Sequence, residues 1–232
     1  MTWNLRRLLA GAVLAAWAAL FWFVLLSGRT GLYLSTRTAW LVPAGAAILT
    51  VAALGRLASG RSGAPPPVRR SDLRGASLLV IPVIVLLALP ASTLGTFALG
   101  RRPVFGVGAT APSGGLSSGT LSMVDVARAQ ATKEDLAALQ HRNAETVVMV
   151  GFVATQPGEP STEFMLSRFI ITCCVADATE TQVRVVDVPA GSARPNAWVQ
   201  VTGRIYALGS QVIIDMTSMK PIPRPADPYL TG

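Results

Sequence analysis

Three long apolar segments without a charged residue dominate the first hundred residues and restrict what this chain can fold into. They cover residues 8–27, 38–55 and 75–100. A helix needs about 20 apolar residues to cross the ~30 Å hydrocarbon core of a bilayer. Pro82 and Pro90 fall in the third segment, and membrane helices tolerate proline because neighbouring groups satisfy the freed carbonyls. The sequence therefore predicts a three-helix membrane anchor over residues 1–102, with spans at about 8–27, 38–55 and 76–99.

The net charge of +8 is distributed unevenly along the chain. Residues 1–102 contain 11 Arg and one Asp, which gives +10, whereas residues 103–232 contain 9 Lys and Arg against 11 Asp and Glu, which gives −2. Arginine beside apolar segments is typical of a membrane protein, whereas a nucleic-acid-binding domain carries its basic patch on the folded domain. We therefore expect the lipid bilayer, and no nucleic acid, as a partner.

The arginines on the loops also predict an orientation. With the N-terminus inside, seven arginines fall on the inner side of the membrane and four on the outer side. The positive-inside rule then places the N-terminus in the cytoplasm. Three crossings make this a multi-pass protein of the plasma membrane with an extracytoplasmic C-terminal domain.

The predicted spans contain no Asp, Glu, Lys, Arg or His. Ion pathways and proton relays usually depend on ionisable groups within the membrane. The spans are thus typical of an anchor or a docking surface rather than of a transport pathway.

The second half of the chain begins with a Gly/Ser-rich stretch, residues 103–120, which predicts a flexible tether. Two hydroxyl residues, Ser122 and Thr132, are each followed three positions later by an aspartate. This spacing is a helix-start pattern and predicts short helices over 122–130 and 133–140. His141, the only histidine, ends the second helix.

Short runs rich in β-branched residues follow, separated by turn residues. Five strands are expected between residues 145 and 222, with an interruption after the second. This pattern favours a small all-β barrel of the OB type, which leaves no exposed sheet edge, and a small sandwich is the alternative. The extracytoplasmic domain is thus expected to span residues 121–232. Its predicted strands are 146–155, 163–174, 181–188, 197–208 and 210–222.

The only two cysteines, Cys173 and Cys174, are adjacent at the end of the second predicted strand. Successive side chains of a regular strand point to opposite faces, so the two thiols would then be unable to bind one ion. If the chain bends there, both thiols and Asp177 would converge, although a closed zinc site usually has four ligands. His141 is the one available imidazole, and the sequence does not place it nearby.

Three interpretations of the cysteine pair stay open. The pair binds a divalent metal such as zinc, it forms a labile disulfide in an oxidising compartment, or it packs as ordinary small side chains. No cofactor is assigned from the sequence beyond that possible metal. Nothing beyond the presence of the residue types supports Ser-His-Asp or paired-carboxylate catalysis.

The order of features resembles the YcgQ family of bacterial membrane proteins. Three spans and a tether are followed by "VGFV", "SRFIITCCVADA", "WVQVTGRI" and a C-terminal "PYL". The resemblance implies an accessory subunit of a multi-spanning membrane permease of the YcgR type. The chain lacks the N-terminal cysteine that a lipoprotein would need. The family motif maps onto residues whose roles it does not give: Arg168, Phe169, Cys173, Cys174, Ala176 and Asp177.

We therefore expect a non-enzymatic permease subunit whose external β domain binds the permease or its substrate. A metal-binding domain built on Cys173, Cys174 and Asp177 is one alternative. A thiol-redox protein is the other.

Overall fold

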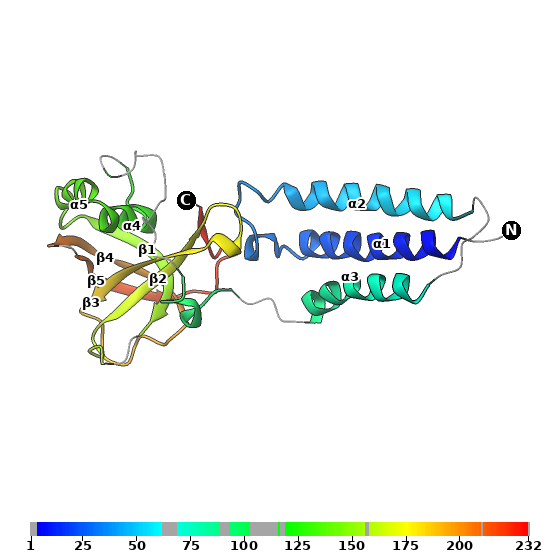
Figure 1. The fold of residues 1–232 in the computed structure, drawn as a ribbon. Coiled ribbons are helices and arrows are strands. Elements are labelled where there is room, and N and C mark those ends of the chain that lie inside the picture. The colour runs from blue at the N-terminus through cyan, green and yellow to red at the C-terminus, as the bar shows by residue number, and fades with distance from the viewer. Residues whose placement is uncertain are drawn as a thin grey trace. The chain divides into compact units, whose positions relative to one another are not determined.

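The structure, a computed structural model, describes residues 4–61, 69–88, 93–102, 116, 119–155, 158–209 and 211–231. The chain divides into two compact units, Met1–Ser92 and Thr93–Gly232. The first holds three long apolar helices, and the second holds two shorter helices and a closed five-stranded barrel (Figure 1). The predicted fold class is confirmed, and the barrel replaces the sandwich alternative.

The first unit consists of α1 (Leu5–Leu26), α2 (Leu41–Ala58) and α3 (Arg70–Ala88). Each is long and apolar enough to cross a membrane. Short 3-10 turns at Thr30–Leu32 and Ser59–Arg61 follow the first two helices.

Helix α1 contacts both α2 and α3. Small residues allow close approach to α2: a Cβ added at Gly11 would lie 2.8 Å from Leu57, and one at Gly45 would lie 2.8 Å from Phe21. Such packing is common between membrane helices because lipid supplies no hydrophobic drive for association. The indole N–H of Trp17 donates to the carbonyl of Leu79 at 3.0 Å and ties α3 to α1.

The third apolar segment differs from the expected span at 76–99. Helix α3 begins at Arg70 and ends at Ala88, whereas residues 93–102 belong to the barrel unit and form a 3-10 turn at Thr96–Ala98. Leu94 and Leu99 in this segment contact an apolar cluster on the barrel, so protein partly covers their side chains. Hydropathy does not distinguish burial in lipid from burial against a domain.

Two short helices precede the barrel, α4 (Met123–Ala131) and α5 (Lys133–Gln140), each within one residue of the predicted bounds. The Ser122 side chain and Asp125 form the expected capping box, and the Thr132 side chain accepts from the Asp135 amide. Of the expected tether, 103–120, only three residues lie among those described. One of them, Leu116, is buried in the barrel core.

Six strands form one sheet in the order β1-β4-β5-β3-β2-β6. An additional β1–β2 pairing closes the first five into a barrel, and β3–β5 and β2–β6 are the parallel pairs. Closure leaves few unpaired backbone groups at an edge. The strands are β1 (Thr146–Ala154), β2 (Phe164–Ile171), β3 (Thr179–Val186), β4 (Trp198–Leu208), β5 (Gln211–Pro221) and β6 (Leu230–Thr231).

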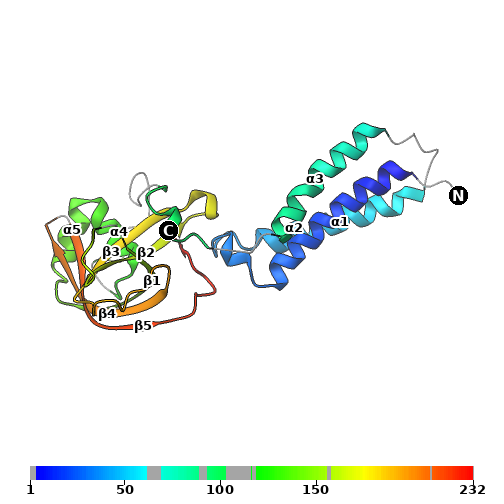
Figure 2. The same cartoon turned by 90° about the horizontal axis from the view of Figure 1, so that it is seen from below.

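Alternate residues of the strands fill the barrel. Helices α4 and α5 pack against it (Figures 1 and 2). Helix α4 contacts β3 and β5, and α5 contacts β4. Val126 of α4 and Leu139 of α5 are inaccessible to solvent and join the same core as Phe164 and Leu166. The helices are therefore part of the domain core and not an appendage.

Strand β4 bends at Gly203, where the β4–β5 register shifts. A Cβ at this position would lie 2.3 Å from the carbonyl oxygen of Asp215 on β5. Glycine is required here because the two backbones approach too closely for a side chain.

We predict that Gly203→Ala destabilises the barrel. Relief of the clash requires backbone movement, for which overpacking costs of roughly 1–3 kcal/mol are typical. Thermal unfolding of the full chain, followed by near-UV circular dichroism, measures the effect. Gly55→Ala in α2 is the matched control, because nothing lies within 4 Å of a Cβ there. Equal melting temperatures for the two variants would contradict the clash.

Candidate functional site

The two cysteines lie in a tight turn, residues 172–177, which we name the cysteine turn. Strand β2 stops at Ile171, earlier than the predicted end at residue 174. The Asp177 carboxylate then accepts three consecutive backbone N–H groups: Thr172 at 3.0 Å, Cys173 at 2.8 Å and Cys174 at 3.2 Å. Hydrogen bonds from amides to a charged acceptor are among the stronger ones. They replace the strand ladder and bend the chain.

A 3-10 turn at Val175–Asp177 completes the bend, with Cys174 at its N-terminal cap. The Asp177 amide donates to the Cys174 carbonyl at 3.0 Å. One donor atom from each of Cys173, Cys174 and Asp177 consequently lies within 4.8 Å of the others. The condition that the sequence left open, a bend that brings both thiols to one side, is met.

His141 is not a member of this three-residue group. It is an exposed residue at the C-terminal cap of α5. The described part of the chain thus provides three candidate ligands at the turn, all from one hexapeptide.

Neither cysteine forms a disulfide in the structure; Cys173 is exposed and Cys174 is half-buried. The pKa of the Cys173 thiol is raised, first by loss of solvation and then by its neighbours Cys174 and Asp177. A raised pKa keeps the thiol protonated at neutral pH and makes it a weak nucleophile. Cys173 therefore lacks the lowered pKa of a redox-catalytic cysteine.

We predict that Cys173 is alkylated slowly at pH 7 to 8. Its alkylation rate should rise at a more alkaline pH than the alkylation rate of a model thiol does. Because the pKa is raised, the reactive thiolate forms only as the pH rises past the ordinary value. Iodoacetamide labelling of Cys174→Ser across pH 7 to 10 measures this, since Cys173 is then the only thiol. Cys174→Ser also removes one cause of the shift, so the comparison variant is Cys174→Ser with Asp177→Asn, which should react faster still. Equal rates in both variants would contradict the influence of Asp177.

Arg168 of β2 holds the C-terminal segment against the barrel. Its guanidinium donates to the carbonyls of Pro228 at 3.0 Å and Asp227 at 2.8 Å, and it lies over the Trp198 ring at 5.7 Å. Burial lowers the pKa of Arg168, while Asp227 opposes this. The planar fork of arginine suits two adjacent carbonyls, and it positions β6 for its parallel pairing with β2.

Phe169 lies on the opposite face of β2, in an apolar cluster that we name the outer cluster. Its buried members are Phe152, Phe169, Ile171, Ala178 and Tyr229. The Phe152 and Phe169 rings stack with centroids 5.9 Å apart. Phe169 and Ile171 share this face, as strand alternation predicts, whereas Ile170 packs with Ala127 of α4.

Residues 93–102, which we name the docked segment, cover the outer cluster. The Leu94 amide donates to the Tyr229 hydroxyl at 3.2 Å, and the Gly100 amide donates to Glu180 at 2.8 Å. Leu94, Ala98 and Leu99 pack on the cluster beside Val175 of the cysteine turn.

Two further side chains complete this attachment. The Thr96 amide and hydroxyl both donate to Asn196, at 3.1 and 2.9 Å, and Arg102 donates to the Ala176 carbonyl at 2.8 Å. Ala176 therefore takes part through its backbone. The sequence interpretation missed these docking residues, because most of them lie inside the apolar segment that predicts the third membrane span.

The motif residues thus converge on one region. Arg168 holds the C-terminal segment, Phe169 lies under the docked segment, and Asp177 shapes the cysteine turn. Packing and hydrogen bonds within the domain explain the positions of these residues without any bound ligand. The two thiols lie together in this turn and, with Asp177, provide the three donor atoms described above.

Comparison with known proteins gives one family match. Residues 130–231 match the DUF1980 C-terminal domain, an uncharacterised family. The matched range includes the barrel, the cysteine turn and β6. No curated protein matches the chain.

We predict that Arg168→Gln loosens the C-terminal segment. Loss of a partly buried, hydrogen-bonded side chain typically costs about 1–3 kcal/mol. Amide hydrogen exchange of residues 227–231 should accelerate and the melting temperature of the barrel should fall. Arg204→Gln on β4 is the matched control, since Arg204 is exposed. Unchanged exchange in Arg168→Gln would contradict the anchoring role.

Proposed function

We propose that this protein is a non-enzymatic accessory subunit of a multi-spanning membrane permease, as its resemblance to the YcgQ family implies. Its barrel domain would bind the permease or the transported substrate on the extracytoplasmic side. The observation that carries the proposal is the exposure of α3. Of its 19 residues only Val83 is buried within the chain, while Leu78 is 70% and Ile84 is 58% exposed.

An apolar helix with so little packing against its own unit has a surface for a further transmembrane helix. The predicted spans within these helices carry no ionisable group on which a transport pathway of their own would depend. Docking is the role that such helices fit best. Lipid is the alternative cover for the same surface, and the experiment below separates the two.

The connection to the barrel supports a role at the membrane surface. Only residues 89–92 separate α3 from the docked segment, which hydrogen bonds fix to the barrel. Five peptide links span at most about 18 Å when fully extended. A domain on so short a connection is expected to act next to the membrane, where a permease opens.

We predict that a tagged full-length chain, solubilised in mild detergent, recovers a multi-spanning permease in near-equal amount. Replacing two exposed α3 residues, in Leu78→Ala with Val85→Ala, should lower recovery at least threefold, because the helix contact loses apolar surface. The control is Ile48→Ala with Val51→Ala on α2, where the side chains are 68% and 71% exposed.

Quantitative mass spectrometry of the recovered proteins provides the measurement. Recovery of no multi-spanning protein from native membranes would contradict the subunit role. Equal loss in the α2 and α3 variants would contradict the assignment of the contact to α3.

A second function, binding of zinc at the cysteine turn, is favoured by the convergence of Cys173, Cys174 and Asp177 within 4.8 Å. Three protein ligands with a fourth position open is the arrangement of zinc sites that exchange water or substrate. Asp177 already accepts three amides, which leaves about one of the four lone-pair positions of a carboxylate. Such a site suits transient capture of a metal rather than a closed structural centre.

We predict that the full chain binds one Zn²⁺ more tightly at pH 8 than at pH 6, because thiols release protons on binding. Cys174→Ser should lose at least tenfold in affinity, as measured by competition with a chromophoric chelator. His141→Ala is the control and should bind as the unaltered chain does. A folded chain that binds no zinc at pH 8 would remove this function.

The thiol-redox alternative stays a prediction. The raised pKa of Cys173 counts against rapid thiol exchange. Titration of thiols before and after mild reduction would distinguish it from metal binding.

A further inference from the structure

A cavity of about 550 Å³ lies between the three helices of the first unit, near the end at which α1 begins. Its lining is divided by polarity. Charged and polar side chains, Arg6, Arg56, Ser71 and Asp72, lie at one end of the helices, and apolar ones such as Leu9, Leu14 and Leu79 follow along α1 and α3.

The charges at the polar end do not cancel. Arg6 is paired with Asp72 at 2.7 Å, and Asp72 is the only acidic residue among the first 102. Arg56 is exposed and has no ion-pair partner among the residues that the structure describes. Two arginines against one aspartate leave one positive charge facing the cavity.

The length of the cavity fits one leaflet of a bilayer. Arg6 and Leu14 are eight residues apart on α1, which corresponds to about 12 Å at 1.5 Å per residue. Half of the hydrocarbon core is about 15 Å. With the arginines at the headgroup level, the apolar lining therefore extends over most of one acyl layer.

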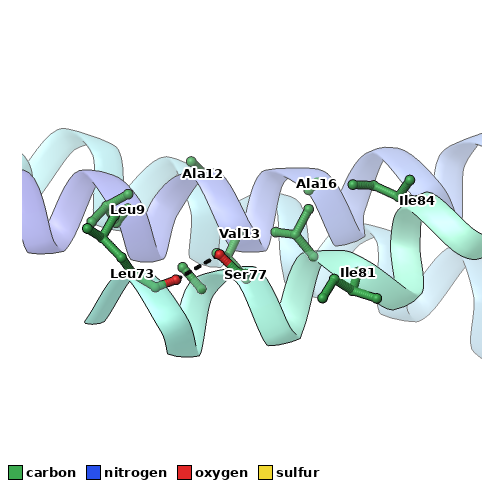
Figure 3. Close-up of a pocket in the computed structure, with 10 residues that line it drawn as sticks. Leu9, Ala12, Val13, Ala16, Leu73, Ser77, Ile81 and Ile84 are labelled. Carbon is green, nitrogen blue, oxygen red and sulfur yellow. Dashed lines mark hydrogen bonds between the residues drawn. The ribbon is translucent and has the colours of Figure 1, made fainter. Parts of the chain in front are cut away.

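A neighbouring groove between α1 and α3 differs from the cavity in its lining (Figure 3). It shares Leu9, Val13 and Ala76 with the cavity but carries no charged residue. Its one hydroxyl, on Ser77, donates to the Leu73 carbonyl of its own helix at 3.0 Å, as the dashed line shows. That groove suits an acyl chain alone, so a headgroup is expected only on the side of Arg56.

We propose that the cavity is a binding site for an anionic phospholipid. The phosphate would accept hydrogen bonds from Arg56 and from Arg6, and one acyl chain would lie along Leu9, Val13 and Leu14. Basic pockets between membrane helices bind anionic headgroups by charge, and the apolar groove adds contact area. The arginine distribution places this end of the helices in the cytoplasmic leaflet, where anionic lipid is found. The site does not depend on the permease partnership.

The test is native mass spectrometry of the full chain in detergent, titrated with phosphatidylglycerol or with phosphatidylcholine of the same acyl chains. Phosphatidylglycerol is expected to bind at least fivefold more tightly. Arg56→Gln should lower that affinity at least threefold, whereas Arg74→Gln should not. Arg74 lies on α3 at the same end of the helices but does not line the cavity. Arg74→Gln removes the same charge as Arg56→Gln.

A second pair of variants tests the acyl part. Ala10→Phe fills the apolar lining and should weaken phosphatidylglycerol binding, whereas Ala19→Phe, on an exposed part of α1 outside the cavity, should not. Equal affinity for the two lipids, or equal effects of Arg56→Gln and Arg74→Gln, would overturn the proposal. Loss of a copurifying membrane protein in Ala10→Phe, with lipid binding unchanged, would show a partner helix in the cavity and would also overturn it.

Discussion

Closure of the five-stranded barrel is the constraint on which the rest of the second unit depends. It requires two pairings between segments far apart in sequence, β1 with β4 and β3 with β5. The close backbone approach at Gly203 allows β4 and β5 to bend together, and α4 and α5 add their apolar faces to the same core. Once the barrel is closed, its outer surface provides fixed positions for the docked segment, the cysteine turn and β6. Loss of closure would therefore remove the candidate site as well as the core.

The Asp177 carboxylate organises the cysteine turn at this surface. By accepting three successive amides it satisfies backbone groups that have left the sheet, which a loop at a strand end must otherwise leave to water. The same bend that ends β2 brings the thiols together. Metal binding would thus use an arrangement that the backbone already requires, so little ordering remains for an ion to impose.

The docked segment connects the three apolar helices, along the chain, to the candidate site. It covers the outer cluster, and Arg102 reaches the Ala176 carbonyl in the cysteine turn. A change at the thiols, whether a bound ion or a partner, would act on groups that contact this segment. The Tyr229 hydroxyl and Arg168 add the C-terminal segment to the same region, so that segments distant in sequence meet beside the motif residues.

Much of the architecture follows from the sequence by itself. Charge-free apolar runs predict three helices long and apolar enough to cross a membrane, hydroxyl-to-aspartate spacing starts α4 and α5, and β-branched runs between turn residues give five strands, because each of these signals is local. The adjacency of the two thiols is also evident from the sequence alone. What only the tertiary structure decided was non-local: that residues 93–102 leave the membrane segment to cover the barrel, and that Asp177 turns the chain at Cys173. Both outcomes depend on which distant groups satisfy an apolar face or a backbone amide, and hydropathy and spacing carry no information about that choice.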